Sequence, residues 1–283
     1  MSVVAASSSV ITDTPRSVAA WVTRLKLESL PILAPTAETL EVLRVNEDTV
    51  DAHMLAEAIA NDPLMTLKVL GHVGAMRIDR DGSDTETATE ALVMLGITPF
   101  FRCFGPQTVV DDVLADWPEA LAGFNRVLRR AHRAANFAIS FAVHRMDHDA
   151  AVIHEAALLH DFAELLLWLY APALALQIGR RQLADPALRS AQVQHEVLQM
   201  DLADLQHELM LRWRLPAMLV RITDPHRAND GQVRNVLLAI RVARHSATGW
   251  DNPALPDDVH EIAALLNMAA EPTLRLLRQV DEA

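Results

Sequence analysis

The sequence has a single cysteine, Cys103, among its 283 residues, so it cannot form an internal disulfide. A chain with so little cysteine is typical of a reducing compartment, and we therefore expect a cytoplasmic protein. The neighbours Phe101, Arg102 and Phe104 predict that Cys103 is a buried structural thiol and not a nucleophile.

Positive charge is also scarce, since 25 lysine and arginine residues stand against 37 aspartate and glutamate residues, a formal net charge of −12. Such a surface repels phosphate backbones and anionic lipid headgroups at long range. We therefore expect neither nucleic acid nor membrane as a partner. The first residues, MSVVAASSSVITDTPR, lack the basic and apolar regions of a signal peptide. No run of about 18 apolar residues is free of charged side chains.

Alternating strand patterns are hard to find, and the sequence contains no glycine-rich phosphate loop. Apolar residues instead recur with helical spacing after a small, polar segment, residues 1–14, which predicts a flexible N-terminus. The segment Gly105 to Pro118 contains two prolines and three aspartates, and it predicts an internal boundary near residue 115. We expect an all-α protein with two helical sub-bundles, residues 15–115 and 116–283.

The apolar spacing also predicts individual helices. Residues 121–146 form an amphipathic pattern, and residues 150–170 are apolar on every face, which is typical of a central buried helix. Later helices are expected over 190–213, 216–223, 231–248, 257–269 and 272–281. The run Asp79 to Thr87 predicts a polar loop. We interpret several methionines as core residues, with adaptable contact sites as the alternative: Met54, Met65, Met76, Met94 and Met218.

His160-Asp161, inside VIHEAALLHDFAELLLWLY, is the most informative dipeptide of the chain. Burying an aspartate in an apolar helix is costly unless it is hydrogen-bonded, paired or bound to a cation. Histidine beside it supplies a nitrogen ligand that divalent metals accept. A metal site is one interpretation, and a core pair in which protein groups satisfy both side chains is the other.

His132 lies on the preceding predicted helix and can border its apolar stripe, so an antiparallel pair of helices would bring it beside His160. Arg129, Arg130 and Arg133 surround it and could hold an anion, although a solvated basic face is the plainer interpretation. His226, in ITDPHRAND, is a further candidate ligand.

The order of these residues resembles the HD superfamily of metal-dependent phosphohydrolases: His132, His160-Asp161, then a Trp-x-Leu-Pro segment followed ten residues later by His226. The first half resembles the opening of an HDOD domain, a signalling relative of the HD and HD-GYP proteins. The stretches that carry this resemblance are LPILAPTAETLEVL, LAEAIANDPLMTLKVL and TATEALVMLGI. It covers about residues 25–250 and implies an HD-like bundle in the C-terminal sub-bundle.

The chain departs from the pattern that this resemblance implies. Leu202 stands where a further histidine is expected, and Arg227 replaces the second histidine of a later pair. Ile240 stands in place of the closing aspartate, and Glu164 in place of a lysine that helps hold phosphate. The GYP signature is absent. Hydrolysis on bound metal needs enough ligands to fix the ion and activate its water, and Glu164 repels a phosphate, so we expect a poor catalyst.

The matching residues His132, His160, Asp161 and His226 therefore predict either no cofactor or a residual, weakly occupied site for Fe, Mn, Mg or Zn. A set of arginines is expected to bind an anion weakly or to substitute for the ion: Arg129, Arg133 and Arg227.

The resemblance implies a non-catalytic bacterial signal-transduction module that contacts signalling proteins in trans, with a homodimer as a further possibility. The groove between the two sub-bundles is the candidate contact surface, because binding sites are frequent at such junctions. The alternative function is a metal-dependent phosphohydrolase of the HD superfamily that acts on a nucleotide or a phosphodiester.

Overall fold

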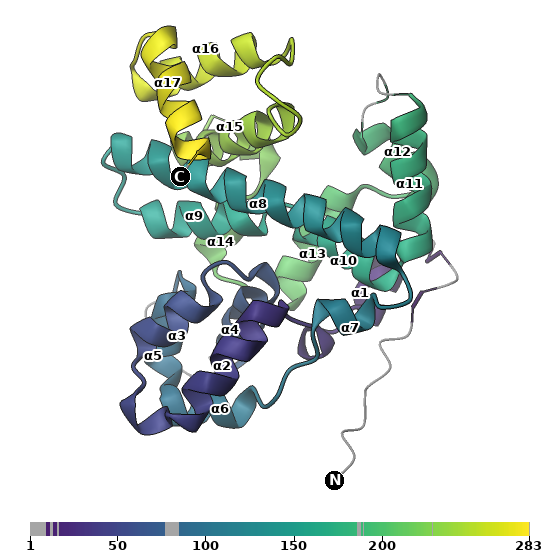
Figure 1. Ribbon diagram of the computed structural model, residues 1–283, viewed down its shortest axis with the longest axis vertical. Helices are drawn as coiled ribbons and strands as arrows, with labels where there is room; N and C mark the ends of the chain where they lie inside the picture. The colour runs from purple at the N-terminus through teal and green to yellow at the C-terminus, as the bar shows by residue number, and fades with distance from the viewer. Residues whose placement is uncertain are drawn as a thin grey trace. The chain divides into compact units, whose positions relative to one another are not determined.

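The computed structural model describes residues 10–11, 14–15, 17–76, 85–185, 188, 190–227 and 229–282. Most of the predicted flexible N-terminus and most of the predicted loop Asp79 to Thr87 lie outside these residues. The chain is 75% helical, and the described residues contain no strand beyond an isolated bridge between Ile32 and Val109. The predicted all-α fold is confirmed (Figure 1).

The helices follow one another along the chain with short connections. The α-helices are α1 (Val18–Arg24), α2 (Ala34–Val45), α3 (Ala52–Ile59), α4 (Pro63–Met76), α5 (Ala88–Leu95), α6 (Ile97–Cys103), α7 (Val110–Val113), α8 (Pro118–His144), α9 (Ala150–Leu159), α10 (Phe162–Tyr170), α11 (Pro172–Ala184), α12 (Ser190–Leu198), α13 (Leu202–Arg212), α14 (Ala217–Ile222), α15 (Gly231–His245), α16 (Leu255–Leu266) and α17 (Ala270–Asp281). Short 3-10 turns are η1 (Leu27–Ser29), η2 (Glu47–Thr49) and η4 (Pro225–Arg227).

The chain divides into two compact units. Unit 1 comprises Met1–Val127 and Phe162–Pro216, and unit 2 comprises Leu128–Asp161 and Ala217–Ala283. Within unit 1, α3 packs against α2, α4 and α5, and α10 packs against α11 and α13. Within unit 2, α9 packs against α14 and α15, and α16 packs against α15 and α17. This grouping is discontinuous in sequence, and the consecutive division at residue 115 stays a prediction.

Two helices expected to be continuous are broken, so these predictions are wrong in detail. The apolar segment 150–170 is divided at His160-Asp161 into α9 and α10. The segment 190–213 is divided into α12 and α13 where Gln199 adopts a φ of 56°. A residue in the left-handed region turns the backbone out of the helical path and ends the helix.

Asp62 organises the start of α4 in unit 1. Its Oδ1 accepts hydrogen bonds from the backbone N–H groups of Leu64 and Met65, both at 2.9 Å, and its Oδ2 accepts one from Leu33 at 2.7 Å. One fully buried carboxylate therefore caps α4 and fixes the segment before α2. On the next turns of α4, Lys68 donates to the Leu30 carbonyl at 2.8 Å. These contacts give the motif IANDPLMTLK a structural role.

Two glycines of α4 lie against the Trp-x-Leu-Pro segment. A Cβ atom at Gly74 would lie 2.2 Å from the carbonyl oxygen of Arg214, and one at Gly71 would lie 3.0 Å from that of Trp213. A side chain cannot fit at 2.2 Å, so the close approach of the two segments requires Gly74, while a side chain at position 71 would require the Trp213 backbone to shift. Arg214 itself has a φ of 55°, which directs its backbone after the end of α13.

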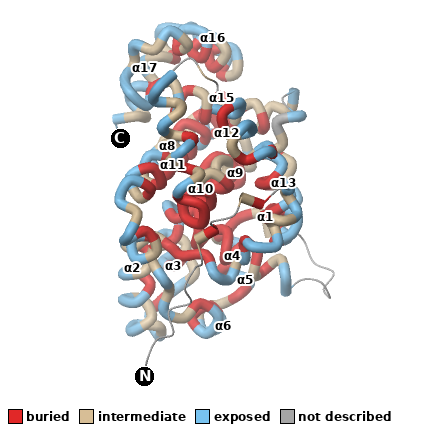
Figure 2. Tube along the Cα trace, turned by 90° about the vertical axis from the view of Figure 1, so that its right-hand side faces the viewer, coloured by how far each residue is buried: buried red, intermediate tan, exposed pale blue. Residues whose placement is uncertain are grey.

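The apolar character of the segment around α10 reflects its burial. Every residue of α10 except Glu164 is buried, as Figure 2 shows in red. Among the described residues, no single helix has both the length and the apolar character needed to cross a membrane. The stretch Ala150–Tyr170 together with α11 reaches that length and composition only as a pair bent by 114°.

Two predictions about burial are wrong. Cys103 is exposed, because it lies at the last position of α6 with its side chain turned away from the core. Met65 is buried as expected, but Met54, Met76 and Met94 are 39%, 54% and 46% exposed. These methionines lie on the outer faces of their helices. The helical spacing in the sequence had predicted core positions for them.

Candidate functional site around Asp161

Asp161 lies at the break between α9 and α10, with its side chain 13% exposed. Arg130, on α8, donates from Nε at 2.9 Å and from Nη2 at 2.7 Å to the same oxygen, Oδ2. The other oxygen, Oδ1, lies 3.0 Å from Nδ1 of His160. A second guanidinium, that of Arg244 on α15, lies 3.9 Å from Oδ2. Three side chains from three segments of unit 2 thus converge on one carboxylate.

His160 and Asp161 contact each other directly at the break between α9 and α10. Side chains at adjacent positions of a continuous helix point about 100° apart. His160 caps α9 with helical backbone angles, φ −58° and ψ −36°, and its N–H donates to the Ala157 carbonyl three residues back, before α10 begins at Phe162. The His160 ring and the Asp161 carboxylate can then form a direct hydrogen bond.

Electrostatics around Asp161 strongly favour its ionised form. Burial raises the pKa of a carboxyl group, but the Arg130 guanidinium, the His160 hydrogen bond and the more distant Arg244 outweigh burial. The pKa of Asp161 therefore lies well below its usual range. The site consequently contains an anionic carboxylate compensated by protein cations.

His132, the first predicted ligand, lies close enough to His154 on α9 to affect its titration. The pKa of His154 is lowered, mainly by burial and to a smaller extent by the neighbouring charge of His132. Its imidazole is therefore neutral near pH 7. His154 was not among the predicted site residues. Its position six residues before His160, on the same apolar segment, was the available signal.

His226, the fourth predicted ligand, is exposed in η4, where its backbone N–H donates to Asp224 at 2.9 Å. Its neighbour Arg227 is exposed and pairs with the same aspartate at 3.5 Å. Arg129 is exposed on α8. The arginine that binds Asp161 is thus Arg130, which the sequence marked only as one of several basic neighbours of His132.

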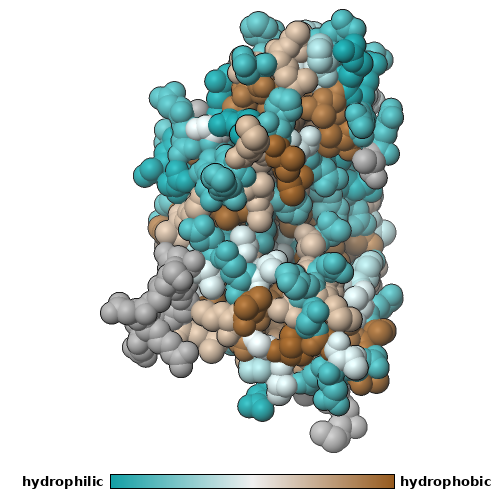
Figure 3. All heavy atoms as spheres, turned by 90° about the vertical axis from the view of Figure 1, so that its left-hand side faces the viewer, coloured by the Kyte–Doolittle hydropathy of each residue, from teal (hydrophilic) through white to brown (hydrophobic). Residues whose placement is uncertain are grey.

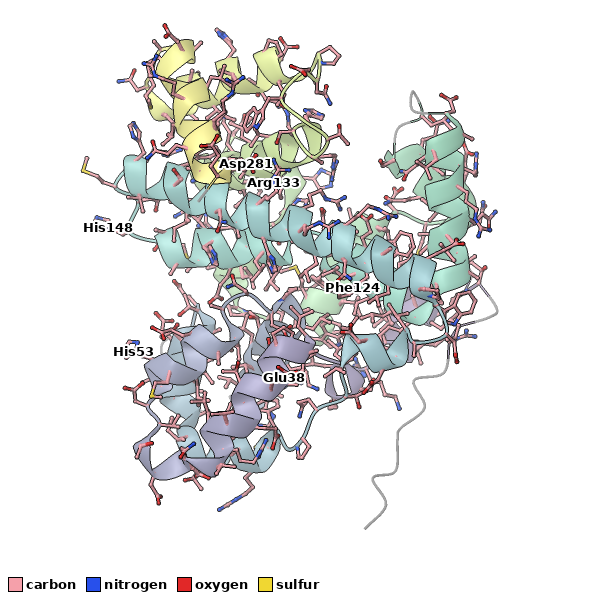
Figure 4. The ribbon with its side chains drawn as sticks, viewed as in Figure 1. Glu38, His53, Phe124, Arg133, His148 and Asp281 are labelled. Atoms are coloured by element: carbon pink, nitrogen blue, oxygen red, sulfur yellow. The ribbon has the colours of Figure 1, made fainter. Side chains whose placement is uncertain are left out.

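Arg133 binds the end of the chain within unit 2. Its guanidinium donates to both carboxylate oxygens of Asp281 at 2.6 and 2.9 Å, and Figure 4 shows the two side chains meeting. It also donates to the Ala243 carbonyl at 2.9 Å and to the Ser246 hydroxyl at 2.6 Å. These bonds fasten α17 to α8 and α15. Anion binding by Arg133 stays a prediction.

A second buried carboxylate in unit 2 is held in a similar way. Asp258 on α16 is fully buried, and its Oδ1 accepts from Nε and Nη2 of Arg241 at 3.1 and 2.7 Å. Its Oδ2 lies 2.5 Å from Nδ1 of His245. Arg241 and His245 are four residues apart on α15, a spacing that places both on one face. That spacing could have indicated the cluster, which the sequence interpretation missed.

Within the ranges that the structure describes, no three His, Cys, Asp or Glu side chains are grouped so that they could hold a metal ion. His160 and Asp161 are brought together, His132 lies near His154, and His226 is exposed on η4. What the described groups form around Asp161 is a network of ion pairs and hydrogen bonds.

Comparisons with known proteins agree with this architecture. The MmoQ response regulator from Methylococcus capsulatus str. Bath superposes with a TM-score of 0.66 at 19% identity, covering 89% of this chain and 99% of that chain. A virulence factor from Campylobacter jejuni subsp. jejuni superposes with a TM-score of 0.62 at 19% identity, covering 89% of this chain and 92% of that chain. An HDOD domain protein with unknown function from Geobacter sulfurreducens superposes with a TM-score of 0.50 at 14% identity, covering 94% of this chain and 96% of that chain.

At these identities the structural likeness concerns the fold. A comparison with curated proteins finds no match. The family model of the HDOD domain matches residues 30–229, well over half of the chain, and it confirms the resemblance found in the sequence. The chain therefore belongs to the HDOD domain family.

Proposed function

We propose that this HDOD protein is a non-catalytic module that works in signal transduction by contacting other proteins. One observation carries the proposal: Arg130 binds, through two nitrogens, the aspartate that would be the metal ligand of an HD phosphohydrolase. In this account an ion pair within the protein performs the structural task of a metal ion.

Charge explains why Arg130 and a metal would compete. A divalent cation placed on Oδ2 of Asp161 would approach the guanidinium groups of Arg130 and Arg244, at 2.7 and 3.9 Å from the same oxygen. Repulsion between like charges at about 4 Å amounts to several kcal/mol at the effective dielectric of a protein surface. Asp161 is therefore already neutralised, and its surroundings oppose a second cation.

The remaining predicted ligands do not compensate for this repulsion. A metal that activates water needs several protein ligands and an open position. His160 hydrogen-bonds Asp161, His132 lies near His154, and His226 belongs to an exposed turn. The residues present do not fit a hydrolytic metal centre, which supports a binding role over catalysis.

Elemental analysis and an activity screen on one preparation test the proposal. We expect the purified chain to contain far less than one Fe, Mn or Zn per molecule. We also expect no hydrolysis of bis-p-nitrophenyl phosphate, of nucleotides or of cyclic dinucleotides with added Mn²⁺, Fe²⁺ or Mg²⁺. Arg130→Met tests whether Arg130 and a metal ion compete for Asp161. Arg129→Met is the matched control, because Arg129 is exposed on the same helix. Metal-dependent turnover that Asp161→Ala abolishes would establish the phosphohydrolase alternative instead.

A further inference from the structure

Exposed apolar side chains gather on two neighbouring helices of unit 1. Met54 on α3 is 39% exposed, and Val93 and Met94 on α5 are 63% and 46% exposed. The two helices pack against each other. Figure 3 shows hydrophobic residues at the surface on the face of the molecule where these helices lie. We call Met54, Val93 and Met94 the α3/α5 patch.

Exposed acidic side chains lie within one turn of the α3/α5 patch residues on the same helices. Asp51 precedes α3 and accepts from the Met54 N–H at 2.9 Å, while Glu90 on α5 accepts from the Glu86 N–H at 2.7 Å. These capping bonds hold both carboxylates at the surface beside the apolar side chains. Glu57, one turn after Met54, is also exposed.

The sequence around the patch has charge of only one sign. Residues 45–67 and 85–101 contain no lysine or arginine, and they contain seven acidic residues: Glu47, Asp48, Asp51, Glu57, Asp62, Glu86 and Glu90. Asp62 is fully buried, so the others provide the surface charge. An apolar patch with such a rim attracts a partner whose apolar residues are bordered by positive charge.

We infer that the α3/α5 patch is a docking surface for a cationic amphipathic helix of a partner protein. The inference rests on the proposed function, since it names where and with what chemistry the protein contact occurs. Two methionines suit this role, because an unbranched, polarisable side chain adapts to different apolar partners. The exposed apolar faces of α3 and α5 would contact one side of the incoming helix, and the rim carboxylates would pair with its lysines or arginines.

Methyl NMR on the full chain tests the inference directly. With [ε-¹³C]methionine labelling, the methyl signals of Met54 and Met94 report on the patch. The probe is a synthetic Lys/Leu amphipathic helix of about 18 residues, and the matched control is a Glu/Leu peptide with the same apolar face. We expect the cationic peptide to shift both methyl signals saturably, and the anionic peptide to leave them unchanged. Raising the salt to about 0.5 M should weaken binding several-fold.

Substitutions separate the patch from general stickiness. Met94→Ser and Glu57→Lys should each weaken binding of the cationic peptide about tenfold, since the first removes an apolar contact of the patch and the second reverses a charge of its rim. Met146→Ser is the control, because Met146 is 84% exposed but lies after α8 in unit 2. It should leave the affinity unchanged. Circular dichroism verifies that each variant is folded.

Several outcomes would overturn the inference. Equal shifts with both peptides would show a sticky surface without charge selection, and no saturable shift at Met54 and Met94 would show that the patch does not dock a helix. A dimer in sedimentation velocity that Val93→Glu dissociates would assign the patch to a second copy of the chain. Failure of the proposed function is distinguishable from all of these, because it appears as metal-dependent turnover in a separate assay.

Discussion

Asp62 in unit 1 is fully buried and Asp161 in unit 2 is 13% exposed, and the two aspartates are satisfied by different kinds of group. Asp62 accepts three hydrogen bonds from backbone N–H groups and one from the side chain of Thr36. Asp161 is held by the side chains of Arg130 and His160, with Arg244 nearby. A carboxylate satisfied mainly by backbone N–H groups is part of the fold itself. A carboxylate satisfied by side chains depends on a few residues whose substitution can change the chemistry of the site.

The largest expected effect comes from Asp62→Ala, which leaves three N–H groups without their acceptor. We expect a loss of about 3 kcal/mol or more in the free energy of unfolding, measured by urea denaturation. Asp51→Ala is the control, because Asp51 caps α3 through one N–H group at the surface. It should cost about 1 kcal/mol. Equal losses for both variants would contradict the role given to Asp62.

Asp161→Ala should cost about 2 kcal/mol, because it leaves the Arg130 guanidinium without its carboxylate in a half-buried site. The same loss is expected in the presence of EDTA and of Mn²⁺, since the account assigns the pairing to Arg130. Urea denaturation under both conditions measures it. A loss that appears only when Mn²⁺ is present would indicate a metal-stabilised site.

Lys68 makes the Asp62 region sensitive to alkaline pH. Burial lowers the pKa of its ammonium group from 10.5 to about 8, against the raising effect of Asp62 and Glu28. Between these two pH values the unfolded chain binds more protons than the folded chain, so stability should rise with pH by up to about 1 kcal/mol per unit. Lys68→Met should remove this rise. A wild-type slope that the substitution leaves unchanged would show that Lys68 does not cause it.

Asp161 should instead contribute to the acid limb of the stability profile. Because its folded pKa is depressed, its contribution is complete above the unfolded value of about 4 and is lost as the pH falls toward the folded pKa. We expect wild-type stability to fall more steeply than that of Asp161→Asn between about pH 4 and the lowest pH at which the chain stays folded, as urea denaturation at each pH would measure. Parallel profiles would contradict the depressed pKa.

Much of the fold could be predicted from the sequence, because helical spacing of apolar residues reports directly on which face is buried. The central buried segment and the amphipathic helix before it were found in this way. The breaks at His160-Asp161 and at Gln199 could not be predicted in this way, since each depends on tertiary contacts or on one left-handed residue in an otherwise helical pattern. Exposure of Met54 and Met94 was missed for a related reason, as spacing does not show which apolar positions a neighbouring helix covers.

The candidate site was predictable only in part. His160 and Asp161 stood out because a charged pair within an apolar run demands a partner. The sequence did not identify that partner, since Arg129, Arg130 and Arg133 are near neighbours on one helix. A small rotation of α8 about its axis decides which of them faces α9. His154 and the Asp258 cluster were missed because their partners lie on other helices.

A double-mutant cycle on Arg130 and Asp161 tests the central claim most directly. Urea denaturation of the wild type, Arg130→Met, Asp161→Asn and the double variant, in EDTA and again in Mn²⁺, gives the coupling energy of the pair. We expect a coupling of about 1 to 2 kcal/mol that is the same in both buffers. A coupling near zero, together with stabilisation of the wild type by Mn²⁺ that Asp161→Asn removes, would show that a metal and not Arg130 is the partner of Asp161.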